Sequence, residues 1–309
     1  SAATQAAGVS LSSPAWLYPH GGWLAPAALV RHWLREGGIR WRGGCAVHAL
    51  RRVDGGWQAL DAQQRVLAGA DVVVLANADD VPRLAASAGG DDAALLEHSL
   101  RHERGQLSLI AATAGLPLPR LPLAGDGYAI ALPDGRLLCG ATSTPLPGGG
   151  DVRPATATVE AADSLSSSMP LQAADHEFNL QRLARLLGTL PPLDMQAVAG
   201  RAAVRLGTHD RLPLVGFIAA ARGSATAGRL RDFERLPGLV VCCGLGGRGI
   251  TWAPLLGELA AAQLCGAPLP MEGRLADALD PLRFALRAAR RPHATARAPV
   301  ADVAARFRS

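Results

Sequence analysis

Glycines that could bring the backbone close to a ligand occur late in the chain, in the stretch VVCCGLGGRGITWAP at residues 240–254. This stretch contains a G-x-G-x-x-G pattern. It follows an apolar run from Leu239 to Cys243 and precedes a helix-like stretch from Ala253 to Leu264. That order is the context of a dinucleotide-binding turn. Glycines allow close approach of the backbone, and the following helix offers free N–H groups and the positive end of its dipole.

The surroundings of this turn do not fit a pyrophosphate site. A Rossmann fingerprint requires a second strand that ends in an acidic residue about 20 residues after the glycines. Here Glu258 comes only nine residues after Gly249, inside the predicted helix, and no second strand follows before GAPLP at 266–270. The turn suits a delocalised anion as well as a phosphate, and a reduced flavin carries such an anion across N1 and the C2 oxygen.

Histidine and cysteine positions predict no metal site. His98 and His102 are four residues apart, which suits a metal on a helix, but the region reads as a loop with surface histidines and no third ligand. The cysteine count is odd and includes no C-x-x-C pair, so neither a disulfide framework nor a zinc site is expected, and a reducing cytoplasm is favoured. The five cysteines are Cys45, Cys139, Cys242, Cys243 and Cys265.

Composition limits the class of protein. The 309 residues are 49% hydrophobic, enough for one large domain or two ordinary ones, but no apolar run approaches the roughly 20 residues of a spanning helix. We therefore expect no membrane partner. The N-terminus lacks the basic and apolar regions of a signal peptide. The net charge is +5 and every basic residue is Arg, so RNA binding is permitted rather than indicated.

The types of predicted secondary structure change along the chain. The sequence predicts a helix over 26–38, a hairpin around the DGG turn at 54–56, and a strand over 70–78 that is buried on both faces, as in parallel sheets. The middle holds separated strand-like runs and a helix over 175–193, whose leucines 180, 183, 187 and 190 share one face. Further expected segments are a short helix or loop after 78, a loop over 145–157, a strand and Pro-containing turn over 202–216, an irregular stretch over 219–236 and an amphipathic helix after 271.

This pattern places α/β segments at both ends of a more antiparallel middle. It favours one layered domain built from discontinuous pieces, with a second sheet domain inserted. We expect three segments: a partial FAD-binding domain over 1–97, a substrate domain over 98–216, and a return to the first domain with a C-terminal helix and tail over 217–309. The assignment of FAD to the first and last segments depends on the resemblance described next.

Six segments resemble a known flavoenzyme family, in the family's order: YPHGGWLAPAALVRHWL, VVVLANA, RGQLSLI, DGYAIALPDGRLLCGATS, VRLGTHDRLPLVG and CGLGGRGITWAPLLGELAAAQLCGAPLPM. The family is the FAD-dependent oxidoreductase half of the bifunctional tRNA 5-methylaminomethyl-2-thiouridine biosynthesis protein, within the D-amino-acid oxidase and glycine oxidase class. The resemblance covers the chain from about Tyr18 to about Arg290. It implies an α/β (α+β) fold: an FAD/NAD(P)-binding-like layered domain, N-terminally incomplete, with an inserted, mostly antiparallel substrate-domain sheet.

The resemblance also implies roles for individual residues. Arg205 matches the position whose guanidinium binds the substrate carboxylate, Arg248 lies beside flavin and substrate, and Tyr128 is a substrate-side tyrosine. The late glycine turn is expected under the flavin ring. The expected FAD contacts are Gly21, Gly22, Trp23, Ala76, Asn77, Gly244, Gly246, Gly247, Gly249, Ile250 and Thr251.

Each of these residues also has an alternative role that involves no ligand. Without the resemblance, the expected role of Arg205 is that of an arginine at a strand end, solvated or paired with Asp210. Arg248 could equally be a surface loop arginine, and Tyr128 could lie on an exposed strand face. The segment YPHGGWLAP could be an ordinary glycine turn before a helix, and VVVLANA could be a core strand.

The implied reaction is the FAD-dependent oxidation of a secondary amine, the carboxymethylaminomethyl side chain of a wobble uridine in tRNA. Hydrolysis of the resulting imine releases glyoxylate and leaves an aminomethyl group, and dioxygen reoxidises the flavin. The expected partners are tRNA and a methyltransferase half on the same full-length chain. Two alternatives stay open: an oxidase of free glycine or sarcosine, and a non-catalytic fragment.

One element of this class, the N-terminal βαβ unit, is absent from the part of the chain that resembles it. There the phosphate-binding glycine loop belongs to an N-terminal βαβ unit, and only a short stretch without a glycine cluster precedes Tyr18 here. Because the chain also begins with Ser, we expect a C-terminal fragment of a longer protein. Half of the FAD contacts would then be missing, and tight FAD binding by this piece alone is not expected.

Overall fold

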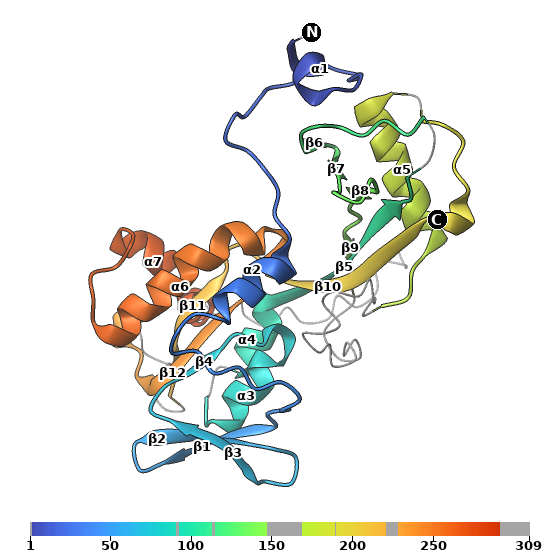
Figure 1. The fold of residues 1–309 in the computed structure, drawn as a ribbon. Coiled ribbons are helices and arrows are strands. Elements are labelled where there is room, and N and C mark those ends of the chain that lie inside the picture. Colours follow the sequence, from blue (N-terminus) through green and yellow to red (C-terminus); the bar gives the residue numbers. More distant parts are fainter. Residues whose placement is uncertain are drawn as a thin grey trace, which may run out of the picture. The chain divides into compact units, whose positions relative to one another are not determined.

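The computed structural model describes residues 2–90, 93–112, 115–146, 169–188, 190–220 and 228–290 (Figure 1). The chain divides into two compact units, each built from separate segments. Unit A comprises residues 1–46, 100–211 and 244–252, and unit B comprises 47–99, 212–243 and 253–309. The three-segment division expected from the sequence stays a prediction. Most of the predicted loop over 145–157 and residues 291–309 of the expected C-terminal tail lie outside the described residues.

A three-stranded sheet organises unit B. Its order is β11-β12-β4, with β11 (Leu214–Ala219) antiparallel and β4 (Val73–Leu75) parallel to β12 (Arg235–Cys243). The prediction of a strand over 70–78 buried on both faces is wrong in extent and burial, since Val72 and Val74 are exposed. Leu75 is buried whereas Val72 and Val74, which project from the other face, are exposed, so only one face of β4 is covered in the described part of the chain.

The hairpin in unit B confirms the predicted turn. β1 (Ala49–Val53) and β2 (Gly56–Leu60) pair antiparallel with Val53 opposite Gly56, and β3 (Val66–Ala70) adds a third strand. Asp54 and Gly55 have φ values of 50° and 85°. Two positive values in a two-residue loop are typical of a type I′ turn, which matches the twist of the flanking strands.

Gly238 allows β12 to pass close to a neighbouring backbone in unit B. Its φ is +72°, and a Cβ at this position would lie 2.4 Å from the carbonyl oxygen of Asp71. Beside it, Trp57 Nε1 donates a hydrogen bond to the Pro237 carbonyl at 3.1 Å. A side chain at residue 238 would therefore combine an unfavourable φ with a clash against backbone that cannot easily move.

We expect Gly238→Ala to lower the free energy of unfolding by about 2 kcal/mol or more, from left-handed strain of about 1 kcal/mol plus the clash. Gly55→Ala is the matched control, because Gly55 also has positive φ (+85°) but its Cβ would meet no atom within 4 Å. Urea unfolding of both variants measures the difference. Equal losses would show that close approach to Asp71 is unimportant.

A larger antiparallel sheet forms the centre of unit A, as the separated strand-like runs predicted. The long strand β5 (Leu100–Ile110) lies between β10 (Ala199–Thr208) and β8 (Leu137–Gly140). The order continues through β7 (Gly127–Ala131) to β6 (Leu123–Gly125), and β9 (Thr144–Pro145) pairs with β5.

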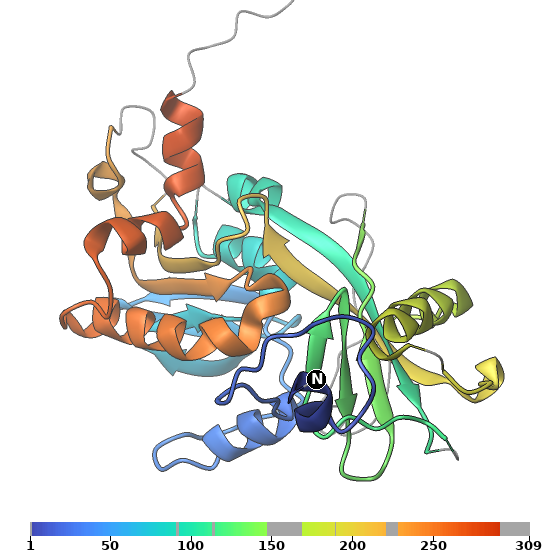
Figure 2. The same cartoon turned by 90° about the horizontal axis from the view of Figure 1, so that it is seen from above.

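Helix α5 (Ala173–Leu187) packs on one face of this sheet (Figure 2). Leu183 and Leu187 are buried in the unit's core, and the partly buried Leu180 and Leu190 pack against the same cluster, as predicted. The helix ends earlier than the expected residue 193. Its C-cap is Gly188 with φ +82° and ψ −138°, a backbone conformation that glycine adopts without the strain a side chain would add.

The remaining helices follow the predicted pattern in part: the one amphipathic helix expected after residue 271 is instead two helices, α7 and α8. The helix expected over 26–38 is shorter, since α2 ends at Trp33, and the uncertain stretch after residue 78 is helical as α3. Among the described residues, no helix is long and apolar enough to cross a membrane. The elements not yet given are α1 (Ala2–Ala7), α2 (Pro26–Trp33), η1 (Ala78–Asp80), α3 (Val81–Ser87), α4 (Ala93–Ser99), η3 (Met195–Ala197), η5 (Leu230–Asp232), η6 (Gly246–Arg248), α6 (Gly249–Cys265), α7 (Gly273–Leu279) and α8 (Arg283–Arg290).

Candidate functional site

The sheet of unit A has two chemically different faces. Side chains of β5 alternate between them, as strand geometry requires. Gln106 and Ser108 point toward α5 and are fully buried. The other face, which we call the uncovered face, carries Glu103, Gly105 and Leu107 of β5, Tyr128 of β7, and Arg201, Ala203 and Arg205 of β10. Apart from the buried Gly105, these residues are only partly buried, so this face is accessible to a ligand.

Arg205 lies on the uncovered face with its guanidinium over Gly105. A Cβ on Gly105 would lie 2.5 Å from both Cζ and Nη2 of Arg205, so the glycine leaves the space that the guanidinium occupies. Within the described residues, Arg205 makes one hydrogen bond, from Nη1 to the Thr142 carbonyl at 3.4 Å, and no ion pair. A planar guanidinium with free donors is well suited to binding a carboxylate through two hydrogen bonds.

The nearby acidic residues are engaged elsewhere. Glu103 is opposite Arg205 in the strand register, but its Oε1 accepts from Arg101 at 2.8 Å and its Oε2 accepts from Ser143 at 2.7 Å. Asp210, the partner that the residues alone favoured, accepts from the Thr208 hydroxyl at 3.0 Å. The charge of Arg205 therefore stays available to an external anion.

Thr142 is itself held by the buried network on the opposite face. Its backbone N–H donates to the Gln106 carbonyl at 3.0 Å, and its hydroxyl accepts from the Gln106 N–H at 3.0 Å. The Gln106 side chain is tied at both ends to the backbone of Gln172, each contact at 2.9 Å. Buried polar groups that are satisfied in this way rigidify their surroundings. The network thus positions the carbonyl that holds Arg205.

Tyr128 shares the uncovered face with Arg205. In the register it is paired with Gly140, which is paired in turn with Leu107. Burial raises the pKa of the Tyr128 hydroxyl, and the positive charge of Arg205 opposes that shift. Both side chains project from the same face of the sheet, and the raised pKa keeps the phenol protonated as a hydrogen-bond donor.

The late glycine turn packs on the same strand that carries Arg205. A Cβ on Gly207 would lie 3.8 Å from the Cα of Gly246, and η6 packs against β10 within unit A. Gly246 has φ +58°, and Gly246, Gly247 and Arg248 are exposed. A Cβ on Gly247 would meet no atom within 4 Å. The start of α6 therefore presents backbone N–H groups beside β10, two residues from Arg205.

The other predicted FAD contacts stay predictions. Ile250 and Thr251 begin α6 at exposed positions next to the turn, and Gly244 packs on Thr208 of β10. Gly21, Gly22 and Trp23 lie in an exposed segment before α2. Ala76 and Asn77 follow β4 in unit B, also at exposed positions.

Sequence reasoning did not single out Gly105, Thr142 or Arg201. Gly105 and Thr142 could have been suspected only from their place in motifs, since neither carries a charge or a reactive group. Arg201 has no local signal, because it is one of many arginines in the chain. The structure identifies them by position: Gly105 lies beneath the Arg205 guanidinium, the Thr142 carbonyl accepts from it, and Arg201 lies on the same strand.

Metal and thiol chemistry find no support in the described part of the chain. No group of three or more potential metal ligands occurs there. The expected loop is wrong, because His98 lies on helix α4 and His102 on strand β5; His98 is exposed as expected, whereas His102 is buried. Burial raises the pKa values of Cys139 and Cys243 to about 12, which keeps both thiols protonated and unreactive. Cys243, 2% exposed, therefore packs in the core.

Comparison with known proteins adds independent evidence. The protein family described as DAO, FAD dependent oxidoreductase, matches residues 3–263. The chain is 42% identical over 299 residues to the tRNA 5-methylaminomethyl-2-thiouridine biosynthesis bifunctional protein MnmC of Methylibium petroleiphilum, a match that covers 92% of this chain and 42% of that protein. It is also 42% identical over 287 residues to the protein of the same name from Burkholderia multivorans, covering 89% of this chain and 39% of that protein. The chain thus spans about two fifths of these relatives.

Solved structures support the fold. The glycine oxidase of Geobacillus kaustophilus matches with a TM-score of 0.52 and 23% identity, over 77% of this chain and 52% of that chain. The L-proline dehydrogenase of P. horikoshii matches with a TM-score of 0.50 and 15% identity, over 77% and 53% of the two chains. The mixed α/β architecture expected from the sequence is confirmed by these matches.

Proposed function

Because the chain belongs to the family of FAD-dependent oxidoreductases, we propose that it oxidises a secondary amine bearing a carboxylate, the carboxymethylaminomethyl side chain of a wobble uridine in tRNA. The products are the aminomethyl uridine and glyoxylate. The choice of tRNA is supported by the names of the relatives in Methylibium and Burkholderia. Such a substrate places the reaction in the cytoplasm, with a methyltransferase half as partner on a longer chain.

One observation carries the proposal. Arg205, with free guanidinium donors, lies two residues from the point where the late glycine turn packs on β10. A carboxylate-binding group and a set of backbone N–H groups therefore meet on one strand of unit A. These are the two recognition elements that a flavin-dependent oxidation of an amino acid requires.

The turn fits FAD, the cofactor of this family. Gly246 and Gly247 are exposed, and a Cβ on Gly247 would meet no atom within 4 Å, so a flat ring can approach the backbone there. The N–H groups at the start of α6 suit the electron-rich edge of the ring. When bound, FAD supplies the acceptor for the hydride that leaves the carbon beside the amine nitrogen.

The chain's own residues orient the substrate. Arg205 binds the carboxylate through its planar fork, which fixes the adjacent CH₂ group and holds the amine in one position. Tyr128 keeps its proton at neutral pH and donates a hydrogen bond on the same face. A neutral amine is required for loss of hydride, and the positive charge of Arg205 favours the neutral form by lowering the pKa of a nearby ammonium group.

The experiment compares three substrates with the purified chain in excess FAD. We expect carboxymethylaminomethyl-modified tRNA to yield aminomethyl uridine, detected by nucleoside mass spectrometry, and glyoxylate, trapped as its hydrazone. Free sarcosine and glycine are expected to react much more slowly. Faster oxidation of sarcosine than of the tRNA would instead identify a free amino-acid oxidase. Absence of any flavin binding in a titration with excess FAD, followed by flavin fluorescence, would indicate a non-catalytic chain and refute the proposal.

A further inference from the structure

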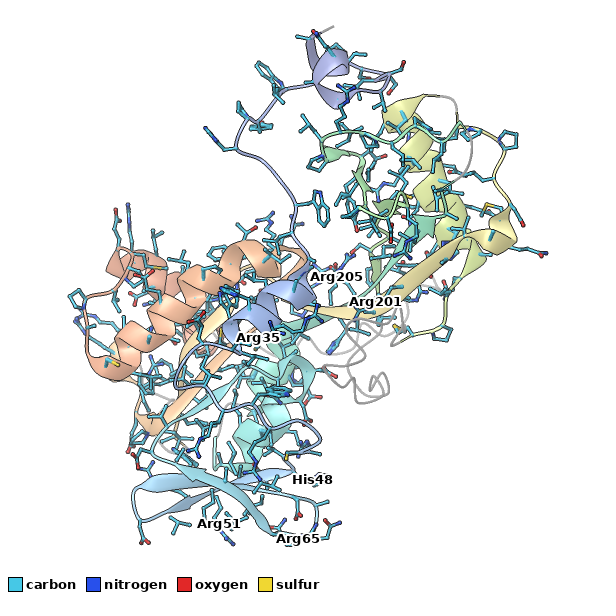
Figure 3. All side chains as sticks on the ribbon, viewed as in Figure 1. Arg35, His48, Arg51, Arg65, Arg201 and Arg205 are labelled. Atoms are coloured by element: carbon cyan, nitrogen blue, oxygen red, sulfur yellow. The ribbon has the colours of Figure 1, made fainter. Side chains whose placement is uncertain are left out.

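A second arginine on the uncovered face has no partner in the described part of the chain. Arg201 lies on β10 opposite Leu107, and the same register places Arg205 opposite Glu103. Positions 201 and 205 differ by an even number, so both side chains project from the same face. Both residues are labelled on β10 in Figure 3. The face therefore carries two arginines along one strand.

The environment of Arg201 is unusual for a structural arginine. Its Nε is buried and makes no hydrogen bond within the described residues. Arginines that fix the fold here are bonded instead: Arg283 donates to the carbonyls of Pro213 and Leu212, at 3.1 and 2.7 Å. Arg235 is likewise paired with Asp280 at 2.9 Å. A buried donor on an always charged group is costly unless it meets a partner.

We propose that Arg201 binds a backbone phosphate of the tRNA whose modified uridine is held by Arg205. This inference rests on the proposed function and names a residue that selects a nucleotide substrate over a free amino acid. A guanidinium matches the oxygens of a phosphodiester through its planar fork. A free amino acid carries no group for this position.

The spacing of the two arginines fits such a substrate. Strands rise about 3.4 Å per residue, so the Cα atoms of residues 201 and 205 are about 14 Å apart. When the carboxylate of the carboxymethylaminomethyl side chain is bound by Arg205, the uracil ring, the ribose and the phosphate lie at increasing distance from Arg205. Between the two arginines on this face lies only the small side chain of Ala203, which leaves room for the nucleoside.

Arg201→Gln tests the contact through RNA binding alone. The probe is a fluorescently labelled anticodon stem-loop, and its affinity for the whole chain is measured by anisotropy at several KCl concentrations. We expect Arg201→Gln to weaken binding about tenfold at 0.1 M KCl and to reduce the slope of log K against log salt by about 0.7, the value for one phosphate contact in single-stranded RNA. Arg201→Lys should keep the slope, because it keeps the charge.

Arg185→Gln is the matched control. Arg185 also belongs to unit A, but its side chain is 58% exposed and pairs with Asp126 at the surface. Its replacement should leave affinity and slope unchanged. Equal RNA binding by Arg201→Gln and wild type, or no stem-loop binding by the wild type, would overturn the inference. The proposed function fails by a different result, the persistence of the carboxymethyl group on modified tRNA, so the two failures are distinguishable.

Discussion

Replacing Arg205 by methionine is expected to lower kcat/KM for the modified tRNA by about 100-fold or more, measured in saturating FAD. Arg205 offers two charge-assisted hydrogen bonds to a carboxylate, each worth about 1.5–3 kcal/mol, and every 1.36 kcal/mol corresponds to a tenfold change in rate. Methionine has similar length but no donor and no charge. The substrate would then bind weakly and without a fixed orientation.

Lysine at the same position separates charge from geometry. Arg205→Lys keeps the positive charge but loses the planar fork. We therefore expect a kcat/KM between those of Arg205→Met and wild type, because the carboxylate is still attracted but is no longer held in one orientation. Arg185→Gln serves again as the control, since it removes a guanidinium from an exposed ion pair worth about 0–1 kcal/mol. A kcat/KM for Arg205→Met within twofold of wild type would exclude Arg205 from carboxylate binding.

Gly105→Ala is expected to reduce kcat/KM by about 10- to 100-fold while leaving the protein folded. The new Cβ would lie 2.5 Å from Cζ and Nη2 of Arg205, well inside the ordinary contact distance of about 3.5–4.0 Å. The end of a long side chain moves more easily than the strand does, so the guanidinium should shift by about 1 Å. A misplacement of that size costs about 100-fold in well-oriented reactions.

Stability and activity should separate in this variant. Alanine is favoured over glycine within a strand by about 0.5–1 kcal/mol, so the melting temperature should stay level or rise. Gly69→Ala in β3 is the matched control, since its Cβ would lie 3.7 Å from the nearest atom, the Trp57 carbonyl oxygen. The double variant Gly105→Ala/Arg205→Met should be no less active than Arg205→Met alone, because both act through one guanidinium. Additive losses would show that Gly105 acts independently.

Several features of the fold could be predicted from local sequence patterns. The turn residues at 54 and 55 predicted the β1–β2 hairpin, because positive φ values there depend on residue type and not on tertiary contacts. The leucine spacing over 175–193 identified the buried side of α5, because a helix repeats its faces at fixed intervals. Both patterns lie within one short window of the chain. Element ends were less accurate, as the ends of α2 and α5 show.

By itself, the sequence determined the glycine turn before α6, the family to which the chain belongs and the choice of Arg205 as a candidate. The tertiary structure alone decided that the turn packs on β10 beside Arg205 and that Gly105 lies beneath its guanidinium. It also decided that Arg201 is on the same face. These relations depend on the pairing of β5 with β10, which lie about a hundred residues apart, and on a register in which a slip of one residue would turn every side chain to the opposite face.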